Sequence, residues 1–168
     1  YETDLLQAKF DQWLASLASG GPKPPDATKP PRWAILDVTP KSQGGAEFTK
    51  LADGSALAGG KNADFDVYTF TAPTTLKGIT AVRLEALADP SMVKGGPGRA
   101  ANGNFDLTDF RVTAAPLNGQ GAPVQLKLVN PKATFEQKGL PVAAAIDGDK
   151  KAGWAVDPEF GKDHAAVF

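Results

Sequence analysis

The sequence predicts an all-β protein, a jelly-roll β-sandwich that is preceded by one N-terminal α-helix. After residue 32, apolar residues recur with a period of two in many short runs, and glycine, proline, asparagine and aspartate separate these runs. In the clearest run, Val124, Leu126 and Leu128 alternate with their neighbours, as in a strand with one face on a core. No second helical pattern appears in the chain. A sandwich or barrel of short strands is the fold class that these observations favour.

The first 19 residues are expected to form the helix. Their apolar residues fall at helical spacing and make one stripe: Leu6, Phe10, Trp13, Leu14 and Leu17. A lone helix must bury such a stripe, either on the sandwich or on an upstream domain. Residues 20–32 contain five prolines and two glycines, a composition that predicts an extended linker. Residues 33–168 are then the sandwich domain.

The strands are predicted from the period of two and the turn residues between the runs. One of them changes phase, because Phe105 and Leu107 share one phase while Phe110 and Val112 share the other. A slip of this kind predicts a β-bulge near Thr108. The predicted strands are 33–38, 46–51, 65–71, 79–87, 105–114, 123–130, 133–137, 142–146, 153–156 and 164–168.

Length and composition argue against several classes of function. The 168 residues are enough for one domain with a core, and the net charge of −1 offers no basic field for nucleic acid. With no cysteine, the chain has no disulfide, no thiol nucleophile, no zinc–thiolate site and no haem-attachment motif. No apolar run approaches the roughly 20 residues that cross a bilayer, so no membrane span is expected.

Two segments resemble known β-sandwich regions. In residues 145–154, the Asp147-Gly148 turn precedes Trp154 by seven residues, and this segment resembles the opening loop of galactose-binding-like (discoidin-type) domains. Residues 79–87 and the glycine-rich run 95–112 resemble a β-sandwich region of multi-domain planctomycete proteins that also carry a c-type cytochrome domain. The resemblance covers about residues 10–168, and the run through Arg99 and Asn104 is its most specific part.

The resemblance implies a structural calcium ion at the Asp-Gly turn, with Asp147 and Asp149 as ligands. Ala152 departs from the family pattern, which has threonine two residues before the tryptophan. The alternative is a solvated turn without metal. The resemblance also implies a secreted or periplasmic protein with further strands after Phe168, so we expect a C-terminally incomplete sandwich in which Ala165–Phe168 lies within a sheet.

A carbohydrate site is the binding function that these residues suggest. Arg99, Asn102 and Asn104 crowd one loop and offer the planar, polar groups that bind hydroxyls and carboxylates. Trp33 and Tyr68 are the candidate aromatic platforms, whereas Trp154 is expected in the core. The alternative for Arg99 is a structural ion pair that pins the loop, to Glu85 or Asp89.

The sequence does not predict an enzyme. His164 is the only histidine, and no motif gives it a nucleophile or acid partner. We therefore expect a non-catalytic module that binds polysaccharide and contacts neighbouring domains of a larger exported protein. The alternative is a structural inter-domain β-sandwich that binds no sugar. An exposed aromatic on a concave face would favour the first function, and the burial of all three tryptophans would favour the second.

Overall fold

The computed structural model describes residues 32–168. Contacts divide the chain into two units, Tyr1–Ala34 and Ile35–Phe168, and every strand of the structure belongs to the second unit. The predicted helix 1–19 and all but the last residue of the predicted linker 20–32 lie outside the described residues.

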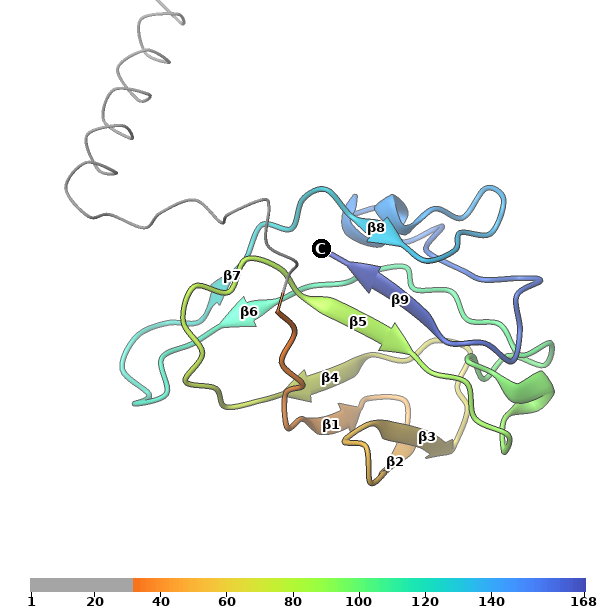
Figure 1. Cartoon of the computed structure of the whole chain (residues 1–168), viewed down its shortest axis with the longest axis horizontal. Helices are drawn as coiled ribbons and strands as arrows, with labels where there is room; N and C mark the ends of the chain where they lie inside the picture. Colours follow the sequence, from red (N-terminus) through yellow and green to blue (C-terminus); the bar gives the residue numbers. More distant parts are fainter. Residues whose placement is uncertain (1–31) are drawn as a thin grey trace, which may run out of the picture. The chain divides into compact units, whose positions relative to one another are not determined.

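The prediction of an all-β protein is confirmed for the part of the chain that the structure describes, which contains nine short strands and no α-helix (Figure 1). Two short 3₁₀ segments, η1 (Val93–Gly95) and η2 (Val142–Ile146), interrupt the strands. The strands are β1 (Thr39–Ser42), β2 (Ala46–Lys50), β3 (Ala56–Gly60), β4 (Tyr68–Thr71), β5 (Arg83–Ala86), β6 (Thr113–Ala114), β7 (Val124–Gln125), β8 (Lys132–Ala133) and β9 (His164–Val167).

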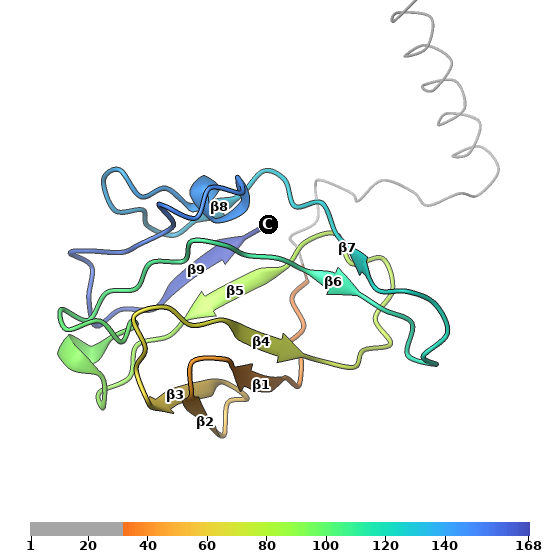
Figure 2. The ribbon, with the colours of Figure 1, turned by 180° about the vertical axis from the view of Figure 1, so that it is seen from behind.

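All pairings between the strands are antiparallel, and they make four small sheets. Three sheets are strand pairs, β1–β4, β2–β3 and β6–β7, and the fourth has the order β5–β9–β8. Both views show β5, β9 and β8 side by side, with β1 to β4 grouped away from β8 (Figures 1 and 2). Two continuous sheets of a jelly roll are not formed by the residues described, so the jelly roll stays a prediction.

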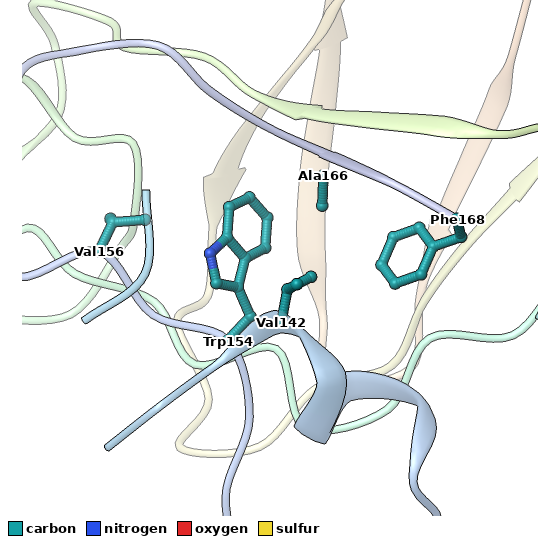
Figure 3. Close-up of a cluster of buried hydrophobic side chains, with 5 residues drawn as sticks. All are labelled: Val142, Trp154, Val156, Ala166 and Phe168. Carbon is teal, nitrogen blue, oxygen red and sulfur yellow. The ribbon is translucent and has the colours of Figure 1, made fainter. Parts of the chain in front are cut away.

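The hydrophobic core lies under the three-stranded sheet (Figure 3). Trp154 is 0% exposed, and its indole Nε1–H donates to the carbonyl oxygen of Phe135 at 2.8 Å. Val142, Val156, Ala166 and Phe168 complete the buried cluster. The predictions that Trp154 is a core residue and that the C-terminal strand lies in a sheet are therefore confirmed.

The strand predicted over 105–114 forms only as β6 (Thr113–Ala114), so the β-bulge predicted near Thr108 is not formed, although both phases of residues 105–112 contact the core. Phe105, Leu107 and Phe110 all contact the core, although Leu107 and Phe110 are an odd number of residues apart. Leu107 exchanges two backbone hydrogen bonds with Trp154, and the Phe110 amide donates to Ala145 at 2.7 Å.

Three predicted strands, 33–38, 142–146 and 153–156, are not formed. Residues 142–146 form the short helical segment η2, which Pro141 precedes. The small side chains of Ala144 and Ala145 let this tight turn be buried. Residues 153–156 make only the isolated bridge between Trp154 and Leu107. β1 begins at Thr39, directly after the predicted strand 33–38. β3 was not predicted, because its alanines and glycines carry no strand signal.

The turn after β1 is held by Asp66, which lies just before β4. Ser42 Oγ–H and the Gly44 amide donate to its carboxylate at 2.5 and 2.6 Å. Desolvation opposes ionisation, but these hydrogen bonds outweigh it and hold the pKa of Asp66 below its ordinary value. The contacts fix where β1 ends and β4 begins.

Candidate functional site

The glycine-rich loop, residues 95–104, folds back on itself through backbone hydrogen bonds. The Gly98 amide donates to Gly103 at 3.0 Å, and the Gly103 amide donates to Ala100 at 2.8 Å. Gly95 and Gly96 have φ of +77° and +76°, a region that side chains other than glycine rarely adopt. The loop thus has a defined path, which places Arg99 and the two asparagines.

Arg99 binds the segment that joins β3 to β4. Its guanidinium donates to the carbonyl oxygens of Gly60 at 2.8 Å and Lys61 at 3.1 Å, and to the Tyr68 hydroxyl at 3.2 Å. In return, Asn62 Nδ2–H donates to the Arg99 carbonyl at 2.7 Å. Arg99 therefore pins the loop, as the alternative interpretation expected, but its partners are two backbone carbonyls and the Tyr68 hydroxyl, not Glu85 or Asp89.

Asn104 points into the protein. Its Nδ2–H donates to Gln137 Oε1 at 2.9 Å, and its Oδ1 accepts from the Val156 amide at 3.0 Å. Asn102 remains exposed, and its Nδ2–H lies 3.5 Å from the Asp157 carboxylate. Of the three polar residues predicted to bind sugar, Asn104 has its side chain committed to the fold, and Asn102 faces solvent.

The two predicted aromatic platforms belong to different units of the chain. Trp33 is 43% exposed and belongs to the first unit, so the second unit is described without it. Tyr68 is 38% exposed, and its ring packs edge-on against Phe48 with centroids 5.0 Å apart. Of the predicted set, the structure joins Arg99 to Tyr68, and joins Asn102 to Asn104, whose amide donates to Asn102 Oδ1 at 3.1 Å.

A groove of about 330 Å³ lies between the β2–β3 pair and the glycine-rich loop. Its walls combine apolar and polar side chains, and Arg99 is one of the latter. At its rim, the hydroxyl and amide of Ser91 donate to Asp89 and lower the pKa of that carboxyl. The principal side chains of the groove are Thr49, Leu57, Asn62, Met92, Val93 and Arg99.

His164 lines a smaller hollow of about 190 Å³. It is 5% exposed, its Nε2 is 2.8 Å from the Glu159 carbonyl oxygen, and its Nδ1 is 3.4 Å from Thr134 Oγ1. Both ring nitrogens face groups of the protein itself. These contacts give the histidine a structural task.

Asp147 and Asp149 are both exposed, and each accepts a hydrogen bond from the amide two residues later. Residues 32–168 gather no third acidic or histidine side chain around them. Calcium takes six to eight oxygen ligands. The same turn also carries the positive charge of Lys150, whose Nζ lies 3.9 Å from the Asp109 carboxylate. The side chains at this turn do not suffice for the ion, and calcium binding stays a prediction.

The sequence interpretation missed Asn62 and Gln137. Gln137 Oε1 accepts from Asn104 and from the Asp157 amide at 3.2 Å, so one amide side chain joins three segments. The partners are 33 and 20 residues away along the chain. No local pattern marks a residue whose partners are this distant.

The described part of the chain has no helix that is long and apolar enough to cross a membrane. Comparison with models of protein families, with curated proteins and with solved structures finds no match for this chain. The functional proposals therefore rest on the residues and their geometry.

Proposed function

We propose that this protein is a non-catalytic docking module, which packs against a neighbouring protein domain through the apolar surface around β4. The observation that carries the proposal is that all four residues of β4 are exposed. A strand inside a sandwich has one buried face, whereas no residue of β4 is buried. A partner domain on this strand would supply the missing cover.

The side chains around β4 are suited to such an interface. Phe70 is 45% exposed and packs edge-on against Phe48 with centroids 5.9 Å apart, next to the Tyr68–Phe48 pair. Phe65, in the turn before β4, is 88% exposed. Fully burying one such side chain is worth about 1.5–3 kcal/mol, and aromatic residues are the usual anchors of protein interfaces.

The jelly roll belongs to this proposal. In it, the β1–β4 and β2–β3 pairs form part of one layer, and additional strands or a second domain complete the other side. Tyr68 and Phe70 then become interior residues of the assembly.

Site-specific photo-crosslinking tests the docking surface. A benzophenone side chain at position 65 is expected to crosslink to a discrete protein, and one at position 77, which is exposed and polar in the native chain, is not. Phe70→Ser should weaken binding to the crosslinked protein about tenfold or more, because it removes an aromatic anchor of the interface. Its melting temperature should stay close to that of the native chain, since Phe70 is outside the core cluster.

Equal crosslinking from positions 65 and 77 would show that the surface has no specific partner. A large loss of stability in Phe70→Ser would instead assign Phe70 to the fold of the module.

Carbohydrate binding is a second candidate function, and the groove beside Arg99 favours it. Leu57 and Met92 offer apolar contact for the C–H face of a sugar ring, while Thr49 and Asn62 offer hydroxyl and amide groups. In this second candidate, the protein is an exported module that binds polysaccharide in this groove, with a structural calcium ion at the Asp147 turn.

A glycan array, probed with and without calcium, tests this candidate. Thr49→Trp fills the groove and is expected to reduce binding at least tenfold, whereas Lys127→Ala, on the separate segment after β7, is the matched control. Arg99 is a poor choice for substitution because it pins the loop. If no glycan binds, or if Thr49→Trp binds as the native chain does, the groove is not a sugar site.

A further inference from the structure

The β6–β7 hairpin is exposed along its whole length. Residues 113–127 are all exposed, and the register between the two strands contains only two residue pairs. One further backbone hydrogen bond, from the Leu126 amide to the Val112 carbonyl oxygen at 2.8 Å, continues the pairing. A two-stranded hairpin without a buried face is marginally stable in water. The hairpin therefore opens at a small cost in free energy, because few buried contacts are lost.

Asn118 and Gly119 form the tip of this hairpin. The Gly119 amide donates to the Pro116 carbonyl oxygen at 3.1 Å, and the Gln120 amide donates to Asn118 Oδ1 at 3.0 Å. A Cβ added to Gly119 would meet nothing within 4 Å. Within residues 32–168, the tip has no hydrogen bond to a distant segment. Only the bonds of the turn itself hold the two residues in place.

The second Asn-Gly pair of the sequence, Asn102 and Gly103, lies in the glycine-rich loop and is held by other segments. Gly103 is buried, and a Cβ added to it would lie 2.6 Å from the Val93 carbonyl oxygen. Its own carbonyl oxygen accepts from the Gly98 amide at 3.0 Å. The next residue, Asn104, has its side chain bonded into the protein. This pair can change its backbone angles only if the loop opens.

We propose that Asn118 is a site of spontaneous deamidation, and that the fold protects Asn102 from the same reaction. The Gly119 amide nitrogen attacks Cγ of Asn118, so an N–Cγ bond forms and the Cγ–Nδ2 bond breaks. The amide proton of Gly119 leaves with Nδ2 as ammonia. Water then opens the resulting cyclic imide at either carbonyl group, which gives aspartate or isoaspartate. The neutral amide is thereby replaced by a carboxylate, with no oxidation or reduction.

Glycine after the asparagine permits this attack. It has no Cβ beside the attacking nitrogen, and its backbone reaches angles that other residues avoid. At Gly119 the surrounding space is open, so the backbone can rotate until the nitrogen meets Asn118 Cγ. At Gly103, the close Val93 backbone and the hydrogen bond from Gly98 oppose the same rotation. The two pairs are chemically alike, and tertiary packing distinguishes them.

Deamidation would add one negative charge to a chain whose net charge is −1. Isoaspartate would also lengthen the backbone by one carbon atom at the tip, which disturbs the turn between β6 and β7. The side chains of the β4 surface and of the groove beside Arg99 are not altered. This inference is therefore independent of both proposed functions.

Peptide mapping by mass spectrometry tests the proposal on the full chain, incubated in mildly alkaline buffer with and without guanidinium chloride. Without denaturant, Asn118 is expected to deamidate at least tenfold faster than Asn102. In denaturant the two rates should lie within about threefold of each other, because both asparagines precede glycine. Asn118→Gln should remove most of the mass gain of about one dalton, since glutamine would close a larger and more slowly formed ring. Asn102→Gln, the matched control, should leave the mass gain unchanged.

The proposal is overturned if Asn118 and Asn102 deamidate at similar rates in the folded protein, or if Asn118→Gln gains mass as fast as the native chain. It is also overturned if both asparagines react in denaturant and neither reacts in the folded protein, because the hairpin would then protect Asn118 as the loop protects Asn102.

Discussion

Replacing Trp154 by alanine is expected to lower the free energy of unfolding by about 3–5 kcal/mol, as large-to-small changes in a core do. The indole is fully buried, packs edge-on against Phe105 with centroids 5.0 Å apart, and lies in the centre of the core cluster. Its removal would leave a cavity where the segment after the Asp-Gly turn makes its isolated bridge with Leu107. The Phe135 carbonyl oxygen would also lose its donor.

Denaturant unfolding followed by circular dichroism measures this effect. Trp154→Phe is the matched control: it keeps an aromatic ring but loses the Nε1–H donor, so its cost should fall well below that of alanine, with the lost hydrogen bond contributing about 1 kcal/mol. A change below about 1 kcal/mol for Trp154→Ala would be incompatible with this packing.

Gly98→Ala is expected to destabilise the protein by about 3 kcal/mol, at the upper end of the usual cost of overpacking. A Cβ at this position would lie 1.8 Å from the Asn104 carbonyl oxygen and 2.5 Å from the Phe105 amide nitrogen. Both obstacles are backbone atoms, so no side chain can move aside. The loop would have to open, and the contacts of Asn104 with Gln137 and Val156 would be lost with it.

Gly59→Ala is the control for this substitution. Gly59 lies in β3, where an added Cβ would meet nothing closer than the Glu47 carbonyl oxygen at 3.9 Å. Thermal unfolding should place Gly59→Ala near the native chain and Gly98→Ala well below it. Similar melting temperatures for the two variants would show that the glycine-rich loop does not take the close path past Asn104.

The features that were predicted from the sequence are those written in local patterns. The alternation of apolar residues indicated an all-β chain, and the large apolar ring of Trp154 after a turn indicated a core position. Each of these depends on a few neighbouring residues. By contrast, residues 142–146 fit both a buried strand and a tight helical turn, and only their packing around Val142 distinguished the two.

The candidate site was less predictable, because its contacts join residues that are far apart in the chain. The sequence by itself determined that Arg99, Asn102 and Asn104 share one glycine-rich loop. Only the tertiary structure decided that Arg99 binds the carbonyls of Gly60 and Lys61, and that Asn104 turns inward to Gln137. Backbone carbonyls are present at every residue and therefore leave no signature in a sequence, so the partner of a side chain that binds them is set by how the distant segments pack.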